Sequence, residues 1–192
     1  MNILAIEGSP RKNGNTNYLL TIILDELKKH NINCEEFFIA LKNIKPCISC
    51  YSCQESEDYK CVINDDFIDS IELIKKSDIL LFATPVYWFG VTAFLKAFID
   101  RFFCLVKFEK TKNIINSTLN GKKFALILTA GSDAFSGADL IVESFMRIAY
   151  FCKLDYLGTI GAYNINSIND INLNKTLTEE IKIFTNKLIH IA

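Results

Sequence analysis

The sequence lacks a strong charge of either sign. Its 192 residues carry a formal net charge of -1, and Lys and Arg do not gather into a run. Binding to nucleic acid or to an anionic membrane surface needs a basic patch. The sequence therefore predicts neither kind of partner.

Long apolar segments are also missing. No apolar run reaches the roughly 18 residues that a membrane span needs. The first residues, "MNILAIEGSP", lack a basic segment, and Glu7 stands where a signal peptide would continue its apolar run. We expect a cytoplasmic protein, and disulfides are rare in that compartment.

Histidine is scarce. The chain has two, His30 and His190, and each falls near the end of a predicted helix, where it suits the negative end of the helix dipole. No Ser-His-Asp or paired-carboxylate arrangement is visible. The sequence thus gives little sign of acid-base or nucleophilic catalysis by its own side chains.

Strand and helix patterns alternate along the chain. Short apolar runs that end at Gly or Pro predict strands, and stripes of apolar residues at helical spacing predict helices. Asp65 or Asp66 is expected to cap the second helix, and Thr176 with Glu179 to form a capping box at the last one. The expected strands are 2–8, 32–40, 78–85, 122–131 and 154–163, and the expected helices are 15–30, 65–77, 90–103, 138–151 and 176–191.

This alternation predicts a doubly wound α/β fold in one domain, residues 1–192. Five strands alternating with five helices imply a parallel sheet covered on both faces. Right-handed crossovers leave the flavodoxin-like strand order 2-1-3-4-5 as the leading topology. Ligands of such sheets bind at the carboxyl ends of the strands.

The loop after the first strand, "GSPRKNGNT" at residues 8–16, has the composition of a phosphate site. Its glycines relax the backbone, its polar side chains offer donors, and the N–H groups of the following helix start complete an anion site. It is neither a Walker A loop nor G-x-G-x-x-G. The candidate phosphate ligands are Ser9, Arg11, Asn15 and Thr16.

Two further loops leave the same edge of the predicted sheet. "TPVYWFG", residues 84–90, carries Tyr87 and Trp88, which could flank a flat heterocycle, although aromatic residues on a loop also serve as core plugs. "TAGSD", residues 129–133, is a turn of small residues whose backbone groups could bond to polar ring edges.

The segment "CISCYSCQESEDYKC" spaces four cysteines as C-x2-C-x2-C-x7-C on an expected loop at 47–61. Three thiolates so close together can surround a cluster, as in ferredoxins. Zinc would accept four thiolates too, but its structural sites usually use two separated C-x2-C pairs. A third hypothesis is that the cysteines bind no metal and are either packing residues or thiols that cycle between reduced and disulfide forms. The candidate metal ligands are Cys47, Cys50, Cys53 and Cys61.

These motifs resemble the NAD(P)H-dependent FMN reductase family and its iron-sulfur flavoprotein branch. "GSPRKNGNT" is similar to the family's phosphate loop, and "TPVYWFGVTAFLKAFIDRF" is similar to its flavin-ring loop and following helix. The resemblance implies FMN, with its phosphate on the first loop. It places the isoalloxazine ring against Pro85, Val86, Tyr87, Trp88, Phe89 and Gly90, with Thr129, Ala130 and Gly131 near the polar ring edge.

The resemblance also implies an activity. It predicts an oxidoreductase that passes electrons from NAD(P)H or a ferredoxin-type donor to a small acceptor, acts as a homodimer or homotetramer, and holds a 4Fe-4S cluster on the cysteine segment. The seven-residue gap before Cys61 is long for that branch, and flavin-only relatives carry similar cysteines. Two alternatives stay open: a flavin-only reductase of quinones, nitro compounds or flavin, and a non-enzymatic electron carrier.

Overall fold

The computed structural model describes residues 1–109, 114–135 and 137–191. Five parallel strands form the central sheet in the order β2-β1-β3-β6-β7. This is the predicted 2-1-3-4-5 order, because β4 and β5 lie outside the sheet, so that β6 and β7 are its fourth and fifth strands along the chain. The flavodoxin-like fold is therefore confirmed. The sheet strands are β1 (Asn2–Glu7), β2 (Asn33–Phe38), β3 (Ile79–Pro85), β6 (Lys123–Thr129) and β7 (Asp155–Ala162).

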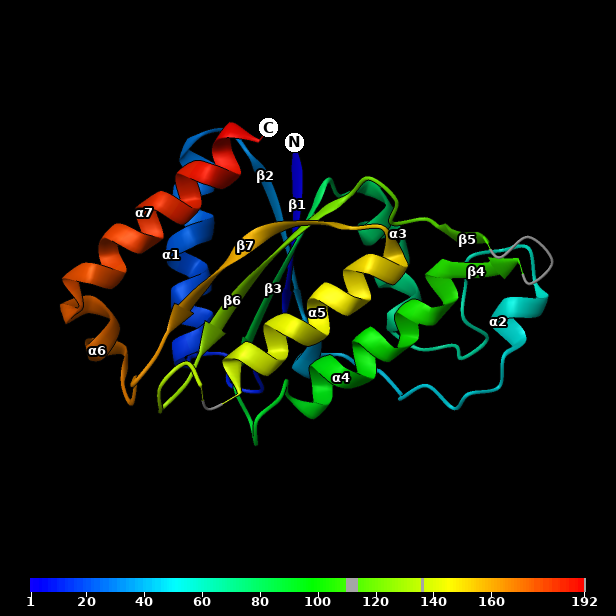
Figure 1. Ribbon diagram of the computed structural model, residues 1–192, viewed down its shortest axis with the longest axis horizontal. Helices are drawn as coiled ribbons and strands as arrows, with labels where there is room; N and C mark the ends of the chain where they lie inside the picture. Colours follow the sequence, from blue (N-terminus) through cyan, green and yellow to red (C-terminus); the bar gives the residue numbers. More distant parts are fainter. Residues whose placement is uncertain (110–113, 136, 192) are drawn as a thin grey trace.

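Helices cover both faces of this sheet (Figure 1). The first face carries α1 (Asn15–Lys29), α6 (Ile168–Leu173) and α7 (Lys175–His190), and the other face carries α3 (Phe67–Lys76), α4 (Ala93–Asp100) and α5 (Ala138–Cys152). No helix among the described residues is long and apolar enough to cross a membrane.

The apolar core has two parts because alternate side chains of a strand point to opposite faces. In β1, Leu4 and Ile6 join the cluster beneath α3, α4 and α5, whereas Ile3 and Ala5 join the cluster beneath α1 and α7. Apart from the exposed Asn2, the side chains of β1 and β3 are almost fully buried, as expected of strands covered on both sides.

The structure adds elements that the hydrophobic pattern did not predict. The predicted helix at 90–103 ends at Asp100 and continues as the 3-10 helix η2 (Arg101–Leu105). After it come β4 (Val106–Glu109) and β5 (Ile114–Ser117), which pair antiparallel outside the main sheet. The short helix η1 (Ile39–Leu41) precedes the cysteine segment, and the short helix α2 (Ser52–Glu55) lies within it.

The predicted capping box at Thr176 and Glu179 is wrong. Asn174 ends α6 and starts α7, so its side chain already accepts a hydrogen bond from the Leu177 N–H at 3.0 Å and leaves no capping position to Thr176. A capping box does occur one helix earlier, between Ser167 and Asp170.

Candidate functional site

Three loops meet at the carboxyl ends of β1, β3 and β6, as the strand order requires. The Gly8 N–H donates to the Ala83 carbonyl at 2.8 Å, and the Val86 N–H donates to the Thr129 carbonyl at 2.8 Å. Backbone hydrogen bonds that extend the sheet thus position the loops. We call residues 8–16, 84–92 and 129–135 the edge loops.

The first edge loop ends at the start of α1, where no side chain caps the helix. Gly14 is the N-cap of α1, makes no side-chain hydrogen bond, and is followed by a first turn without an acidic residue. The first N–H groups of a helix need acceptors, and an anion can supply them. Among the described residues, this helix start therefore fits a phosphate group.

The hydroxyl groups of the first loop have partners in the protein. The buried Ser9 hydroxyl accepts from the Arg11 N–H at 3.2 Å, which fixes the turn. Thr16 shares a 2.6 Å hydrogen bond with Thr129, so α1 is tied to the third edge loop through two buried hydroxyls. Asn15 lies nearby, with its amide 3.5 Å from the Ile165 carbonyl.

The second edge loop is a tight turn that presents its aromatic residues to solvent. Tyr87 and Gly90 exchange backbone hydrogen bonds of 2.9 and 3.0 Å. The residues between them, Trp88 and Phe89, have φ angles of 49° and 65°, a region that bulky residues rarely adopt. Trp88 is 94% exposed, so it is not a core plug.

Thr92 joins two of the edge loops, a role that the sequence did not predict. Its hydroxyl donates to the Gly8 carbonyl at 2.5 Å and accepts from the Leu95 N–H at 3.2 Å, which caps α4 and fastens it to the first loop. A Thr just before an apolar helical stripe is the signal that could have found it.

Glu7, the last residue of β1, is the other residue that the sequence reading did not place in the site. It is 4% exposed, one carboxylate oxygen accepts from the Asn17 amide at 2.8 Å, and the other has no hydrogen-bond partner among the described residues. Burial raises the pKa of this carboxyl to about 7, against the lowering effect of Asn17.

The four candidate metal ligands lie on a second surface, away from the edge loops. We define the cysteine loop as residues 42–66, between η1 and α3. Cys47, Cys50, Cys53 and Cys61 all line one cavity of about 320 Å³. Among the described residues, however, no three His, Cys, Asp or Glu side chains lie close enough to hold a metal ion as they stand.

The thiols differ in environment. Cys47 and Cys50 are exposed, Cys61 is half-buried and Cys53 is buried. Hydrogen bonds from the side chain and backbone of Ser52 lower the pKa of Cys50, whereas burial raises the pKa of Cys53. Cys104, beneath this loop, has its pKa raised to about 12, mainly by burial.

A protein-family model described as NADPH-dependent FMN reductase matches residues 1–154. The chain belongs to this family. It is 38% identical over 101 residues to an iron-sulfur flavoprotein of Methanocaldococcus jannaschii, a match that covers 53% of this chain and 51% of that protein. It is 30% identical over 144 residues to an iron-sulfur flavoprotein of Archaeoglobus fulgidus, covering 75% and 69%.

Solved structures support the fold. Smu.1420 from Streptococcus mutans superposes with a TM-score of 0.74 at 20% identity, covering 97% of this chain and 100% of that one. The chain spans about half the length of several curated relatives that it matches.

Proposed function

We propose that this chain is an FMN-dependent oxidoreductase that takes electrons from NAD(P)H and passes them to a small acceptor. The observation that carries the proposal is the open start of α1, which follows the Ser9–Gly14 turn and is joined to the third edge loop by Thr16 and Thr129. Family membership supports the choice of FMN for this anion site.

In this proposal the first edge loop holds the FMN phosphate. The N–H groups of the first turn of α1 and the exposed Arg11 side chain bind the anion. The small residues Thr129, Ala130 and Gly131 offer backbone groups to the polar ring edge. The turn at Tyr87–Gly90 places aromatic and backbone surface against the ring.

When bound, FMN would supply the redox chemistry, so the protein needs only to bind, orient and tune it. This division of labour agrees with the residues at the edge. Glu7 is the acidic side chain closest to the first loop in sequence, and it is buried beneath α1 against Asn17.

The proposal is tested on protein purified under nitrogen. Heat-released cofactor should be FMN, and NADH or NADPH should bleach the bound flavin, with colour returning when a quinone is added. Release of FAD would contradict the assignment of FMN as the cofactor. A bound flavin that neither NADH nor NADPH reduces would favour the electron-carrier alternative.

We also propose that the cysteine loop holds a 4Fe-4S cluster. Support comes from the single cavity that all four cysteines line and from the iron-sulfur flavoproteins among the relatives. A single zinc ion binds sulfur at about 2.3 Å, which needs four thiolates packed tightly around one point. A cluster spreads its ligands over four irons, so it suits dispersed thiols better.

Iron and sulfide analysis tests the cluster. Near four irons per chain in wild type, lost in Cys50→Ser but kept in Cys34→Ser, would support it, with FMN retained in both variants. Iron and zinc both near zero in wild type would leave the flavin-only reductase. The single domain, the homo-oligomer, the ferredoxin-type donor and the cytoplasmic location stay predictions from the sequence.

A further inference from the structure

We propose that Arg101 and Lys107, which both lie outside the cysteine loop, are positioning residues that give this loop its shape. Arg101 joins the two ends of the loop, and Lys107 fixes its middle. The proposal rests on the proposed role of the loop as a ligand set, but the positioning itself can be measured without a cluster.

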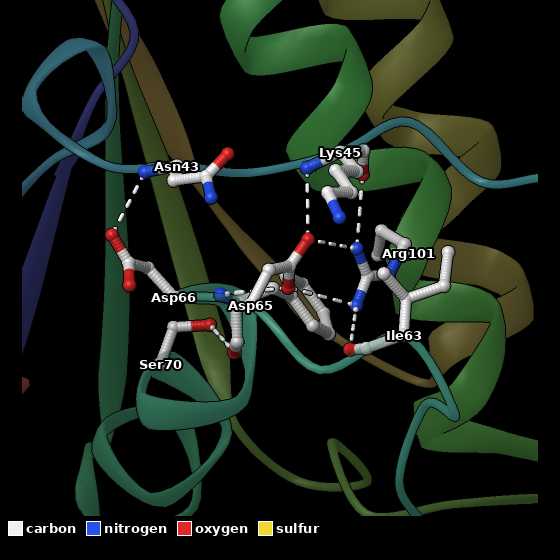
Figure 2. A network of polar contacts seen from close by, with 8 residues as sticks. Asn43, Lys45, Ile63, Asp65, Asp66, Ser70 and Arg101 are labelled. Carbon is white, nitrogen blue, oxygen red and sulfur yellow. Dashed lines mark hydrogen bonds and ion pairs between the residues drawn. The ribbon is translucent and has the colours of Figure 1, made fainter.

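Arg101 begins η2 and is 1% exposed. Its guanidinium donates to the Lys45 carbonyl at 2.9 Å and to the Ile63 carbonyl at 3.1 Å (Figure 2). Lys45 lies two residues before Cys47, and Ile63 lies two residues after Cys61. One side chain therefore binds the backbone immediately outside the first and the last cysteine.

Asp65 completes this junction. Its carboxylate accepts two hydrogen bonds from Arg101, at 2.9 and 3.2 Å, and one from the Lys45 N–H at 2.8 Å (Figure 2). It also accepts one from the Phe67 N–H at 3.2 Å. Asp65 was expected only as a possible helix cap. The arginine also lies over the Phe67 ring, 4.5 Å from its centroid.

The guanidinium also lies near Cys61. Its charged group faces both the Asp65 carboxylate, at 2.9 Å, and the Cys61 side chain. A fixed cation beside the last cysteine would offset part of the negative charge of four thiolates.

Lys107 holds the middle of the loop from β4. Its ammonium group donates to three backbone carbonyls, those of Cys53, Ser56 at 2.6 Å and Asp58 at 2.8 Å. Gln54 adds a second link between the cysteine loop and this region. Its amide donates to the carbonyls of Phe103 at 2.9 Å and Val106 at 2.8 Å. In Figure 1 the pair β4–β5 lies beside α2, in agreement with these contacts.

The loop needs such support from outside. Its regular structure is the four-residue helix α2, and Ser49 and Tyr51 have φ angles of 56° and 60°. Such left-handed conformations cost energy and persist when the surroundings enforce them. Both unusual residues lie between the segments that Arg101 and Lys107 hold.

The first test measures iron, sulfide and FMN in anaerobically prepared variants. Arg101→Lys keeps the charge but loses the fork that reaches both loop ends. Lys107→Met loses the donor, and Lys107→Arg restores it. We expect iron per FMN to fall at least fivefold in Arg101→Lys and Lys107→Met, and to recover at least in part in Lys107→Arg.

Two control variants match these changes. Lys122 also donates to two backbone carbonyls, those of Lys75 and Ser77, but outside the cysteine loop. Arg147 pairs with Glu143 on the exposed side of α5. Lys122→Met and Arg147→Lys should keep iron and FMN within twofold of wild type.

The second test measures the alkylation rate of each thiol by mass spectrometry after metal removal with a chelator. Cys53 and Cys61 should react at least tenfold faster in Lys107→Met and Arg101→Lys than in wild type. Cys104 and Cys152, which are buried in the core, should react as in wild type and so report an intact fold.

The outcomes separate the two proposals. Wild type without iron would refute the cluster, and faster alkylation of Cys53 and Cys61 would still support positioning. Unchanged alkylation in both variants, or equal acceleration in Lys122→Met, would overturn the positioning role. If Arg101→Lys fails to fold, Lys107→Met, whose side chain is only half-buried, decides the matter by the same rates.

Discussion

The edge loops and the cysteine loop are held in place by different means. The edge loops continue buried strands, and backbone hydrogen bonds such as Gly8 to Ala83 fix them. The cysteine loop follows an edge strand and is held by side chains, with Arg101 and Lys107 binding its carbonyls. A site built on strand ends is positioned by the fold itself, whereas the cysteine loop depends on a few side chains from elsewhere in the chain.

This comparison predicts that one substitution can disturb the cysteine loop severely. Arg101→Met leaves Asp65 buried without its cation and should cost about 3–5 kcal/mol of unfolding free energy. The double variant with Asp65→Asn should lose less than the sum of the two single changes. Urea unfolding of all four proteins measures this, and strict additivity would show that the pair does not act as a unit.

Glu7 predicts a pH effect at the edge loops. Its pKa of about 7 exceeds the ordinary value of 4.5, so between these values the folded state binds more protons than the unfolded state. Its contribution to stability is therefore greatest below pH 4.5 and is lost as the pH rises through 7.

Glu7→Gln should remove this loss. Its stability relative to wild type should rise between pH 5 and 8, by at most about 3 kcal/mol, since one pKa unit corresponds to about 1.4 kcal/mol. Denaturant unfolding across this pH range tests it, with the exposed Glu35→Gln as the control. If the unfolding free energies of Glu7→Gln and wild type changed with pH in the same way, the raised pKa of Glu7 would be contradicted.

The phosphate assignment predicts a loss of FMN affinity in the edge loops without any loss of fold. Arg11→Ala should weaken FMN binding by about 1.5–3 kcal/mol, the range for a hydrogen bond to a charged group. Lys12→Ala, an exposed neighbour in the same loop, is the control. Equal dissociation constants for Arg11→Ala and wild type in a flavin titration would remove Arg11 from the site.

Close packing behind the first edge loop predicts a smaller, structural effect. A Cβ atom on Gly8 would lie 2.8 Å from the Cβ of Leu95, whereas a Cβ on Gly90 would meet nothing within 4 Å. Gly8→Ala should therefore cost about 1–3 kcal/mol of stability, and Gly90→Ala much less. Thermal unfolding of the flavin-free proteins distinguishes them, and equal losses would contradict the packing.

The same contrast explains what the sequence could and could not predict. Strand runs and helical stripes predicted the sheet order, and strand order alone brings residues 8–16, 84–90 and 129–131 to one edge. Nothing local in the sequence pairs Arg101 with Asp65, or Lys107 with the carbonyls of 53–58, because those contacts depend on tertiary packing. The hairpin β4–β5 also went unpredicted, since its strands are short and lie outside the sheet.

The central claim is that FMN binds at the edge loops, and Trp88 reports on it directly. It is the only tryptophan and is 94% exposed on the second edge loop. Titration of flavin-free protein with FMN should quench its emission saturably at one FMN per chain, and Trp88→Phe should still bind FMN by flavin fluorescence. Full FMN binding with unchanged tryptophan emission would contradict the placement of the flavin at this edge.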